Sequence, residues 1–274
     1  MKDQTIAFIG GGNMARSLIG GLIKDGFEAG RIIVSDIDED QLDHMGRCFS
    51  VQTTSNNHEA VQKADTIVLA VKPQVLRSVA GQLAPEITGD KLVISIAAGV
   101  RLDDLVTWMD GHRAVVRAMP NTPSLVGSGV TGLVAEDGVD ADQRSTAESI
   151  LRAVGTTVWL ENETQMDSLT AVSGSGPAYF FLIMESMEEA AVKLGLPAET
   201  ARLLVLETAF GASKMALEAE EEPAALRARV TSPGGTTERG IAALEDAGLR
   251  EAFDKALNAA RDRSAELAEL LSKQ

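Results

Sequence analysis

The chain has few of the residues that build disulfides and metal centres. Its 274 residues include one cysteine, Cys48, and three histidines that lie far apart in the sequence. One cysteine excludes an internal disulfide, and the isolated histidines do not have the spacing of metal ligands. We therefore expect no metal site, and the sparing use of cysteine favours a cytoplasmic protein.

Positive charge and long apolar runs are also scarce. The chain has 25 Lys and Arg against 40 Asp and Glu, which gives a formal net charge of −15. Such a surface repels nucleic acid and anionic membranes. The longest apolar runs, such as residues 179–184, are far too short to span a bilayer, and the N-terminus enters a strand-like run without a signal-peptide pattern. We expect neither nucleic acid nor a membrane as a partner.

The first half of the chain alternates short apolar runs with helical patterns. The apolar runs predict strands over residues 5–9, 32–35, 66–71, 92–96, 114–118, 130–134 and 156–160. Helical periodicity covers residues 13–24, 73–83, 101–109 and 141–154. Strands separated by helices of this length require right-handed crossovers in a mainly parallel sheet. The predicted fold class is therefore α/β, with a Rossmann domain over residues 1–162.

Beyond residue 160 the strand signal stops. Helices punctuated by Gly and Pro are predicted over residues 165–172, 177–194, 197–218, 223–229, 236–247 and 249–273, so residues 163–274 form an all-α C-terminal domain. The helix that begins at Pro177 is apolar on nearly every side over residues 179–184 and must be covered on every side. We expect a second copy of the chain to supply part of that cover, which predicts a homodimer through the helical half.

A glycine-rich turn joins the first predicted strand to the first predicted helix. It reads Gly10-Gly11-Gly12-Asn13-Met14-Ala15. In the dinucleotide-binding pattern, the glycine matching Gly10 permits the tight turn, the one matching Gly12 lets a pyrophosphate approach the backbone, and a small residue such as Ala15 lets the helix pack closely. The turn therefore predicts that the chain binds a dinucleotide.

The second predicted strand ends in Ser35-Asp36, at the usual separation from the glycines. An acidic residue there bonds the adenosine 2′-hydroxyl and repels a 2′-phosphate, which favours NADH over NADPH. Asp36 could instead cap the following helix, as could Asp38. Both interpretations stay open.

Two later strand ends offer further polar groups. Lys72, in the segment Ala70-Val71-Lys72-Pro73, stands at the carboxyl end of the sheet, where ligands bind in such folds; it could face phosphate or ribose, or only solvent. The loop Met119–Pro123, which contains Pro120 and Asn121, is stiffened by two prolines and is placed to line the nicotinamide end.

The segment Val230–Ile241 combines hydroxyl residues and two adjacent glycines with the start of an amphipathic run. This layout bares backbone N–H groups at the positive end of a helix dipole, where an anion binds. The alternative is an ordinary helix start with a Thr or Ser cap.

Together these segments resemble the pyrroline-5-carboxylate reductase family. The resemblance is carried by Phe8–Ala15, Ala70–Pro73, Arg117–Pro123, Ala171–Tyr179 and Val230–Thr237. It implies an N-terminal Rossmann domain and a C-terminal helical dimerisation domain, with dimers that often assemble into decamers. It also implies the NADPH- or NADH-dependent reduction of L-1-pyrroline-5-carboxylate to L-proline, the last step of proline biosynthesis.

The resemblance implies roles for single residues as well. The substrate carboxylate would be held by Ser232, Gly234, Gly235 and Thr236, and Ser175 would complete the substrate pocket. Thr237 would lie near the ring nitrogen, as a catalytic residue that orients the imine or relays a proton. The cofactor would be contacted by Gly10, Gly12, Asn13, Met14, Ser35, Asp36, Asn57, Ala70, Val71, Lys72, Pro120 and Asn121.

Three other functions remain open. A β-hydroxyacid dehydrogenase has a similar glycine-rich segment at residues 173–176 but places a catalytic lysine on the next helix, whereas the first lysine here is Lys193, far along it. A reductase of another cyclic imine would use the same chemistry. A non-catalytic NAD(P) sensor would not need the anion-binding loop of the second domain.

Overall fold

The computed structural model of the chain describes residues 4–273. It divides into two compact units, Met1–Ser175 together with Ala260–Gln274, and Gly176–Ala259. The units differ from the predicted ranges 1–162 and 163–274, because the helices around residues 165–175 and the end of the last helix group with the sheet.

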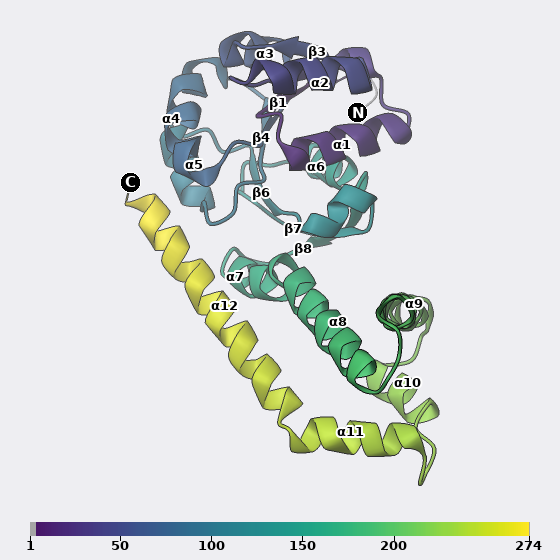
Figure 1. Cartoon of the computed structure of the whole chain (residues 1–274). Coiled ribbons are helices and arrows are strands. Elements are labelled where there is room, and N and C mark those ends of the chain that lie inside the picture. The colour runs from purple at the N-terminus through teal and green to yellow at the C-terminus, as the bar shows by residue number, and fades with distance from the viewer. Residues whose placement is uncertain (1–3, 274) are drawn as a thin grey trace. The chain divides into compact units, whose positions relative to one another are not determined.

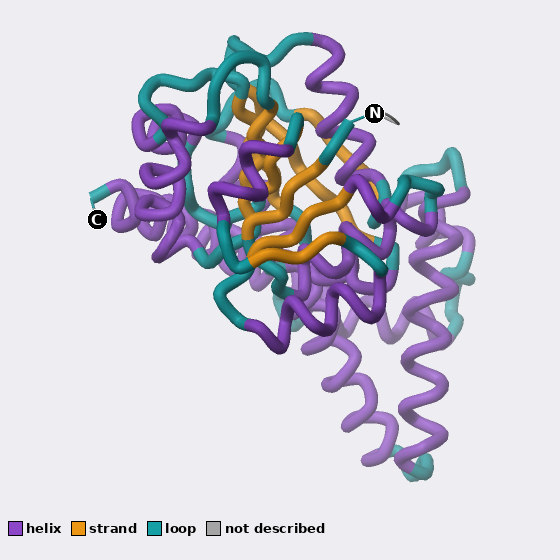
Figure 2. Tube along the Cα trace, turned by 90° about the horizontal axis from the view of Figure 1, so that it is seen from above, coloured by secondary structure: helices purple, strands orange, loops and turns teal. Residues whose placement is uncertain are grey.

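An eight-stranded sheet forms the centre of the first unit, with the strand order β3-β2-β1-β4-β5-β6-β7-β8 (Figures 1 and 2). The strands are β1 (Ile6–Ile9), β2 (Ile32–Ser35), β3 (Gln52–Thr54), β4 (Thr66–Leu69), β5 (Leu92–Ser95), β6 (Val115–Met119), β7 (Gly129–Ala135) and β8 (Gly155–Trp159). All neighbours run parallel except β6 and β7. The predicted mainly parallel sheet is confirmed.

Helices connect the strands and cover the sheet. They are α1 (Asn13–Lys24), α2 (Glu39–Phe49), α3 (Asn57–Lys63), α4 (Pro73–Leu83), α5 (Leu102–Trp108), α6 (Ala141–Arg152) and α7 (Gln165–Leu169). Short 3₁₀ turns lie at η1 (Ala29–Arg31), η2 (Ala84–Glu86) and η3 (Thr122–Val126), and α7 continues into a π-helical turn, η4 (Thr170–Gly174).

The core lies in two layers, one on each face of the sheet. Along β1, Ile6 and Phe8 pack into the layer that contains Leu18 of α1, whereas Ala7 and Ile9 pack into the layer that contains Leu76 of α4. Strands buried on both faces read as unbroken apolar runs, which is why the sequence shows them clearly.

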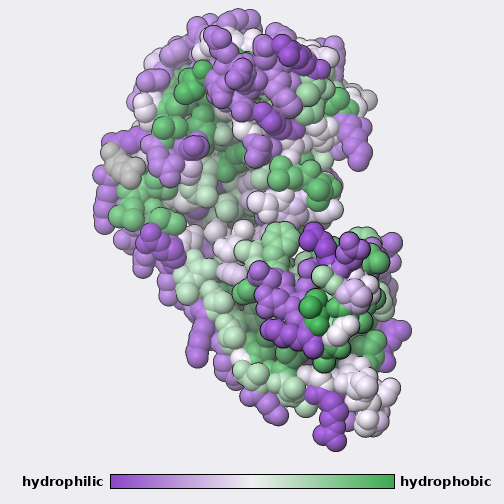
Figure 3. Space-filling model, viewed as in Figure 1, coloured by the Kyte–Doolittle hydropathy of each residue, from purple (hydrophilic) through white to green (hydrophobic). Residues whose placement is uncertain are grey.

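The second unit is entirely helical. It holds α8 (Gly176–Lys193), α9 (Ala198–Glu218), α10 (Pro223–Arg229), α11 (Thr236–Asp246) and the start of α12 (Leu249–Ser272). Large apolar side chains of α8 and α9 are exposed, including Phe181 and Phe210, and Figure 3 shows hydrophobic surface over the helical unit. None of the helices within residues 4–273 has the length and apolar character that a membrane span needs.

Candidate active site

The glycine-rich turn is packed against the end of β4. Gly10 has a φ of +107°, and a Cβ placed on it would lie 2.8 Å from the carbonyl carbon and oxygen of Ala70. Only glycine fits this close approach of two backbones. At Gly12, by contrast, a Cβ would meet no atom within 4 Å. The turn therefore leaves open space over Gly12, as the approach of a pyrophosphate requires.

The first turn of α1 offers unpaired donors beside this space. Gly12 is the N-cap residue and makes no side-chain capping bond. The backbone N–H groups of Asn13 and Met14 donate to no acceptor within the described residues. These groups stand at the positive end of the helix dipole, so an anionic ligand is favoured here.

Asp36 is turned toward the glycine-rich turn. Its Oδ2 accepts from the N–H of Gly11 at 2.6 Å and its Oδ1 from the N–H of Asp38 at 3.0 Å. The cap of α2 is Asp38, which accepts from the N–H groups of Asp40 and Gln41. The capping role proposed for Asp36 therefore belongs to Asp38.

Ser35 and Asn57 meet beneath the same turn. The Oγ of Ser35, which is fully buried, donates to Oδ1 of Asn57 at 2.6 Å, and its carbonyl accepts from the N–H of Gly10 at 2.7 Å. The structure thus brings Gly10, Ser35 and Asn57 together, with the Ser35 side chain facing the protein.

Lys72 and Asn121 stand at later strand ends, in different surroundings. Lys72 immediately precedes α4, whose first residue is Pro73. Asn121 is 9% exposed; its Nδ2 donates to the Ser173 carbonyl at 3.0 Å and its Oδ1 accepts from the N–H of Val130 at 2.9 Å. The side-chain amide of Asn121 is therefore hydrogen-bonded to other parts of the protein. Its neighbour Pro120 is buried as well.

A cavity of about 460 Å³ opens within the first unit beyond the carboxyl ends of β4 and β5. Pro73 and Ala98 contribute from the strand ends, Thr170 and Ser175 from the π-helical segment, and the end of α12 completes the lining. Ser175, predicted to line a substrate pocket, thus borders a cavity at the edge of the sheet where ligands of such folds bind.

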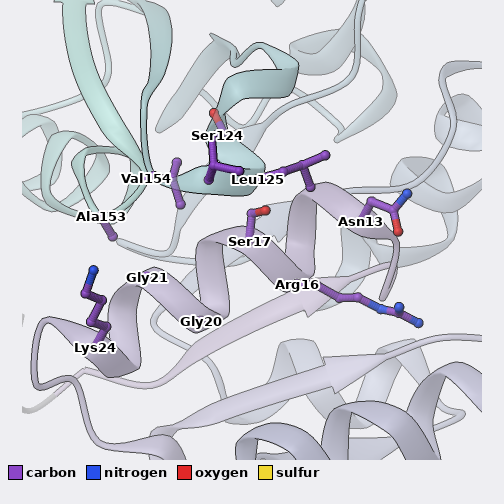
Figure 4. Close-up of a pocket in the computed structure, with 12 residues that line it drawn as sticks. Asn13, Arg16, Ser17, Gly20, Gly21, Lys24, Ser124, Leu125, Ala153 and Val154 are labelled. Atoms are coloured by element: carbon purple, nitrogen blue, oxygen red, sulfur yellow. The ribbon is translucent and has the colours of Figure 1, made fainter. Parts of the chain in front are cut away.

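A second cavity, of about 420 Å³, runs along the flank of α1 (Figure 4). Asn13 lies at its amino-terminal end and Lys24 at the other, with Ser17 between them. Leu125 of η3 faces α1 across it. None of the residues that line this cavity is acidic.

In the second unit, the loop before α11 is held by its own groups. Gly234 has a φ of +71°, and its N–H donates to Oε2 of Glu238 at 2.8 Å. The N–H of Gly235 donates to the Ser232 carbonyl at 3.0 Å. The cap is Gly235, with no side-chain bond, so the alternative of a Thr or Ser cap is wrong.

Free donors follow directly after Gly235, in the first turn of α11. The N–H groups of Thr236 and Thr237 donate to nothing within the described part of the chain. The bond from Gly234 to Glu238 was not predicted from the sequence, although an acidic residue in the third helical position is a known signal of a helix start.

The helices on both sides of this loop are tied together. Arg250 of α12 makes a bidentate ion pair with Glu245 of α11, with N···O distances of 2.8 and 2.7 Å. Arg227 of α10 lies 3.8 Å from the same carboxylate. The hydrogen bonds from Arg250 lower the pKa of Glu245. The loop between α10 and α11 is thus anchored at both ends.

Two family models match the chain. The model described as NADP oxidoreductase coenzyme F420-dependent matches residues 5–99, which contain the glycine-rich turn. The model described as pyrroline-5-carboxylate reductase dimerisation matches residues 163–267, which contain the loop before α11.

Curated relatives match over nearly the whole length. A pyrroline-5-carboxylate reductase of Pseudomonas aeruginosa is 50% identical over 271 residues, which cover 99% of each chain. The chain belongs to the pyrroline-5-carboxylate reductase family. A reductase of the same name from Haemophilus influenzae is 42% identical and is covered to 98%.

Solved structures of this reductase family have the same fold. The structure of a pyrroline-5-carboxylate reductase from Coxiella burnetii has a TM-score of 0.94 at 49% identity and covers 96% of this chain and 98% of its own. The Plasmodium falciparum pyrroline carboxylate reductase with NADP bound has a TM-score of 0.85 at 29% identity, covering 98% and 99%. The predicted α/β domain followed by a helical dimerisation domain is confirmed, and the chain is an oxidoreductase.

Proposed function

We propose that this chain reduces L-1-pyrroline-5-carboxylate to L-proline with NADPH or NADH, as the last step of proline biosynthesis. One observation carries the proposal: a chain of this family combines a dinucleotide turn at Gly12 with unpaired backbone donors at Thr236 and Thr237. A nucleotide sensor would need only the first feature.

The proposed cofactor contacts are the predicted ones, except at two residues. Gly10, Gly12, Asn13 and Met14 bind the pyrophosphate through the open turn and the start of α1, because that surface offers space and unpaired N–H groups. Asp36, Asn57, Lys72 and the backbone around Ala70, Val71 and Pro120 complete the set. The bonds of Ser35 and Asn121 to the protein favour supporting roles for these two side chains.

The bound dinucleotide supplies the hydride. The imino acid, with its ring nitrogen protonated, is already a good hydride acceptor, so the protein chiefly has to hold and orient it. We propose that the carboxylate is bound by the N–H groups of Thr236 and Thr237, while Ser232, Gly234 and Gly235 shape the loop through their bonds to one another and to Glu238. The Thr237 hydroxyl then bonds the ring nitrogen.

We propose that Asp36 favours NADH. Its carboxylate is fixed at the glycine-rich turn by two backbone N–H groups, so it stays where the adenosine ribose binds in such folds. It can accept a bond from a 2′-hydroxyl, whereas a 2′-phosphate would meet a like charge.

The chain forms homo-oligomers through its dimerisation domain. We propose that dimers assemble further, to decamers, and that the protein works in the cytoplasm, in keeping with its single cysteine.

A single assay separates the candidate functions. Oxidation of NADH and of NADPH is followed at the nicotinamide absorbance with pyrroline-5-carboxylate and without substrate. Reduction of NAD⁺ and of NADP⁺ is followed at the same absorbance with a series of 3-hydroxy acids, which donate hydride. We expect turnover with pyrroline-5-carboxylate alone. Activity only with a 3-hydroxy acid would indicate a hydroxyacid dehydrogenase, and cofactor binding without turnover would indicate a sensor.

A further inference from the structure

The helical segment after α7 departs from the α-helix at a particular place. The N–H of Ser175 donates to the carbonyl of Thr170, five residues earlier, at 2.8 Å, next to the π-helical turn Thr170–Gly174. A π-helical turn is rare and is held only where its surroundings support it. Here both Thr170 and Ser175 line the cavity beyond β4 and β5, so the turn sets which groups face that cavity.

The carbonyl of Ser173 lacks its regular helical donor. In a continuing α-helix it would accept from the N–H of residue 177, but that residue is Pro177, which has none. Ser173 is partly buried, and a carbonyl shielded from water without a donor is costly, so such groups find another partner. The partner is Nδ2 of Asn121, at 3.0 Å.

Asn121 is itself fixed from the other side. Its Oδ1 accepts from the N–H of Val130, the second residue of β7, at 2.9 Å. Both polar atoms of the side-chain amide are therefore hydrogen-bonded to the protein, in a residue that is 9% exposed. This geometry ties the π-helical turn to the loop after β6 and to β7.

The turn also rests closely on the sheet. A Cβ on Gly174 would lie 3.1 Å from Cε of Met119, the last residue of β6. A Cβ on Gly132 of β7 would lie 2.2 Å from Cδ1 of Leu169, which directly precedes the turn. Such packing leaves the turn little freedom once its carbonyl is bonded.

We propose that Asn121 is a positioning residue. By donating to the carbonyl for which Pro177 cannot supply the regular helical donor, it holds the π-helical turn so that Ser175 faces the cavity. The amide acts through the turn and does not touch the cofactor, which differs from its predicted role. The kinetic consequence rests on the proposed function, whereas the bond itself is testable without it.

The structural test compares Asn121→Asp with and without Pro177→Ala. Asn121→Asp keeps the acceptor for Val130 and removes the donor for Ser173, whereas Pro177→Ala restores a backbone N–H. We expect Asn121→Asp to lower the urea midpoint of the full-length protein clearly in the parent and much less beside Pro177→Ala. An equal loss in both backgrounds would show that Asn121 does not act through the Ser173 carbonyl.

The kinetic test uses Asn121→Ala, with Asn162→Ala as the matched control at an exposed position. We expect kcat/KM for pyrroline-5-carboxylate to fall about ten-fold or more, while the Kd of NADH stays within about two-fold of the parent value. A parallel loss of NADH affinity would make Asn121 a direct cofactor ligand and overturn the proposal. A parent protein inactive with pyrroline-5-carboxylate would instead refute the proposed function, and the stability test would still stand.

Discussion

Thr237 is the single residue on which the proposed chemistry depends most directly. It is the second residue of α11, its side chain is exposed, and its N–H donates to no acceptor within the described residues. The unpaired N–H of Thr237 can bind an anionic group of a ligand, and the exposed hydroxyl can bind a ring nitrogen of the same ligand.

Thr237→Ala should keep the fold and lower kcat/KM for pyrroline-5-carboxylate by about 100-fold, because the ring nitrogen loses its hydroxyl partner. Thr237→Ser keeps the hydroxyl and should retain most of the activity. Steady-state kinetics of the parent protein and the two variants test this prediction, and circular dichroism checks that each variant is folded. Unchanged kinetics in Thr237→Ala would remove the residue from the site.

Asp36 governs a second residue-scale property, the choice of cofactor. Asp36→Ser removes the charge and keeps a small polar side chain, so the ratio of kcat/KM with NADPH to kcat/KM with NADH should rise by about ten-fold or more. Asp43→Ser, at an exposed position of α2 that pairs with Arg47, is the control for loss of one negative charge. A parent enzyme that already prefers NADPH strongly would contradict the proposed role of Asp36.

Some residue roles were predictable and others were not. Gly10 was, because its pattern is local and the need for a glycine is confirmed by the approach of Ala70. The hydrogen bonds of the Asn121 side chain were not predictable, because its partners lie 9 and 52 residues away in the chain. The division between paired and free N–H groups before α11 depends on backbone geometry, which the glycines permit but do not specify.

At the scale of elements, burial decided what could be predicted. The buried strands β1, β4 and β5 were predicted almost to the residue, since a strand covered on both faces is apolar throughout. Between α2 and β4 the chain was not resolved into elements, because β3 has three residues, none buried, and α3 has seven. The gap between the predicted helices 165–172 and 177–194 is filled by the π-helical turn Thr170–Gly174, which leads into α8. Asn121 donates to the Ser173 carbonyl, which cannot accept a bond from Pro177.

An ion pair joins three segments of the first unit. Arg117 of β6, whose side chain is 4% exposed, lies 2.6 Å from Glu163, which is 25% exposed. The same carboxylate oxygen accepts from the N–H of Leu102 at the start of α5, at 2.8 Å. The pair therefore fixes the approach to α7 relative to the sheet.

Arg117→Ala should lower the free energy of unfolding by about 3 kcal/mol, because it leaves a half-buried carboxylate without its charged partner. Arg152→Ala breaks the exposed pair with Glu148 and should cost less than about 1 kcal/mol. Urea denaturation of each protein at one fixed concentration provides the comparison. Equal losses would mean that burial adds nothing to the Arg117 pair.

At the scale of the whole molecule, the helical unit is not complete as a single chain. Large apolar side chains of α8 and α9, of the kind that usually form a hydrophobic core, are exposed to solvent. The exposed fraction is 65% at Phe181 and 66% at Phe210. Apolar surface of this extent marks an interface, and the family model that covers it is named for dimerisation. The sequence predicted this from the all-round apolar character of residues 179–184, whereas the number of copies depends on geometry that no periodicity encodes.

The last prediction tests that interface. Phe181→Glu places a charge where a second copy should pack, so the assembly should shift to smaller species or fail to form, because an unpaired charge is costly to bury. Val75→Glu, at a 48% exposed apolar residue of α4 outside the matched dimerisation range, is the control and should leave the mass unchanged. Light scattering coupled to size-exclusion chromatography measures the mass of each variant over a range of concentrations, and the parent value gives the number of copies. If Phe181→Glu kept the parent mass, the open face of α8 would not be the surface through which the copies associate, and the exposed side chains of α9, with Phe210 first, would have to supply it.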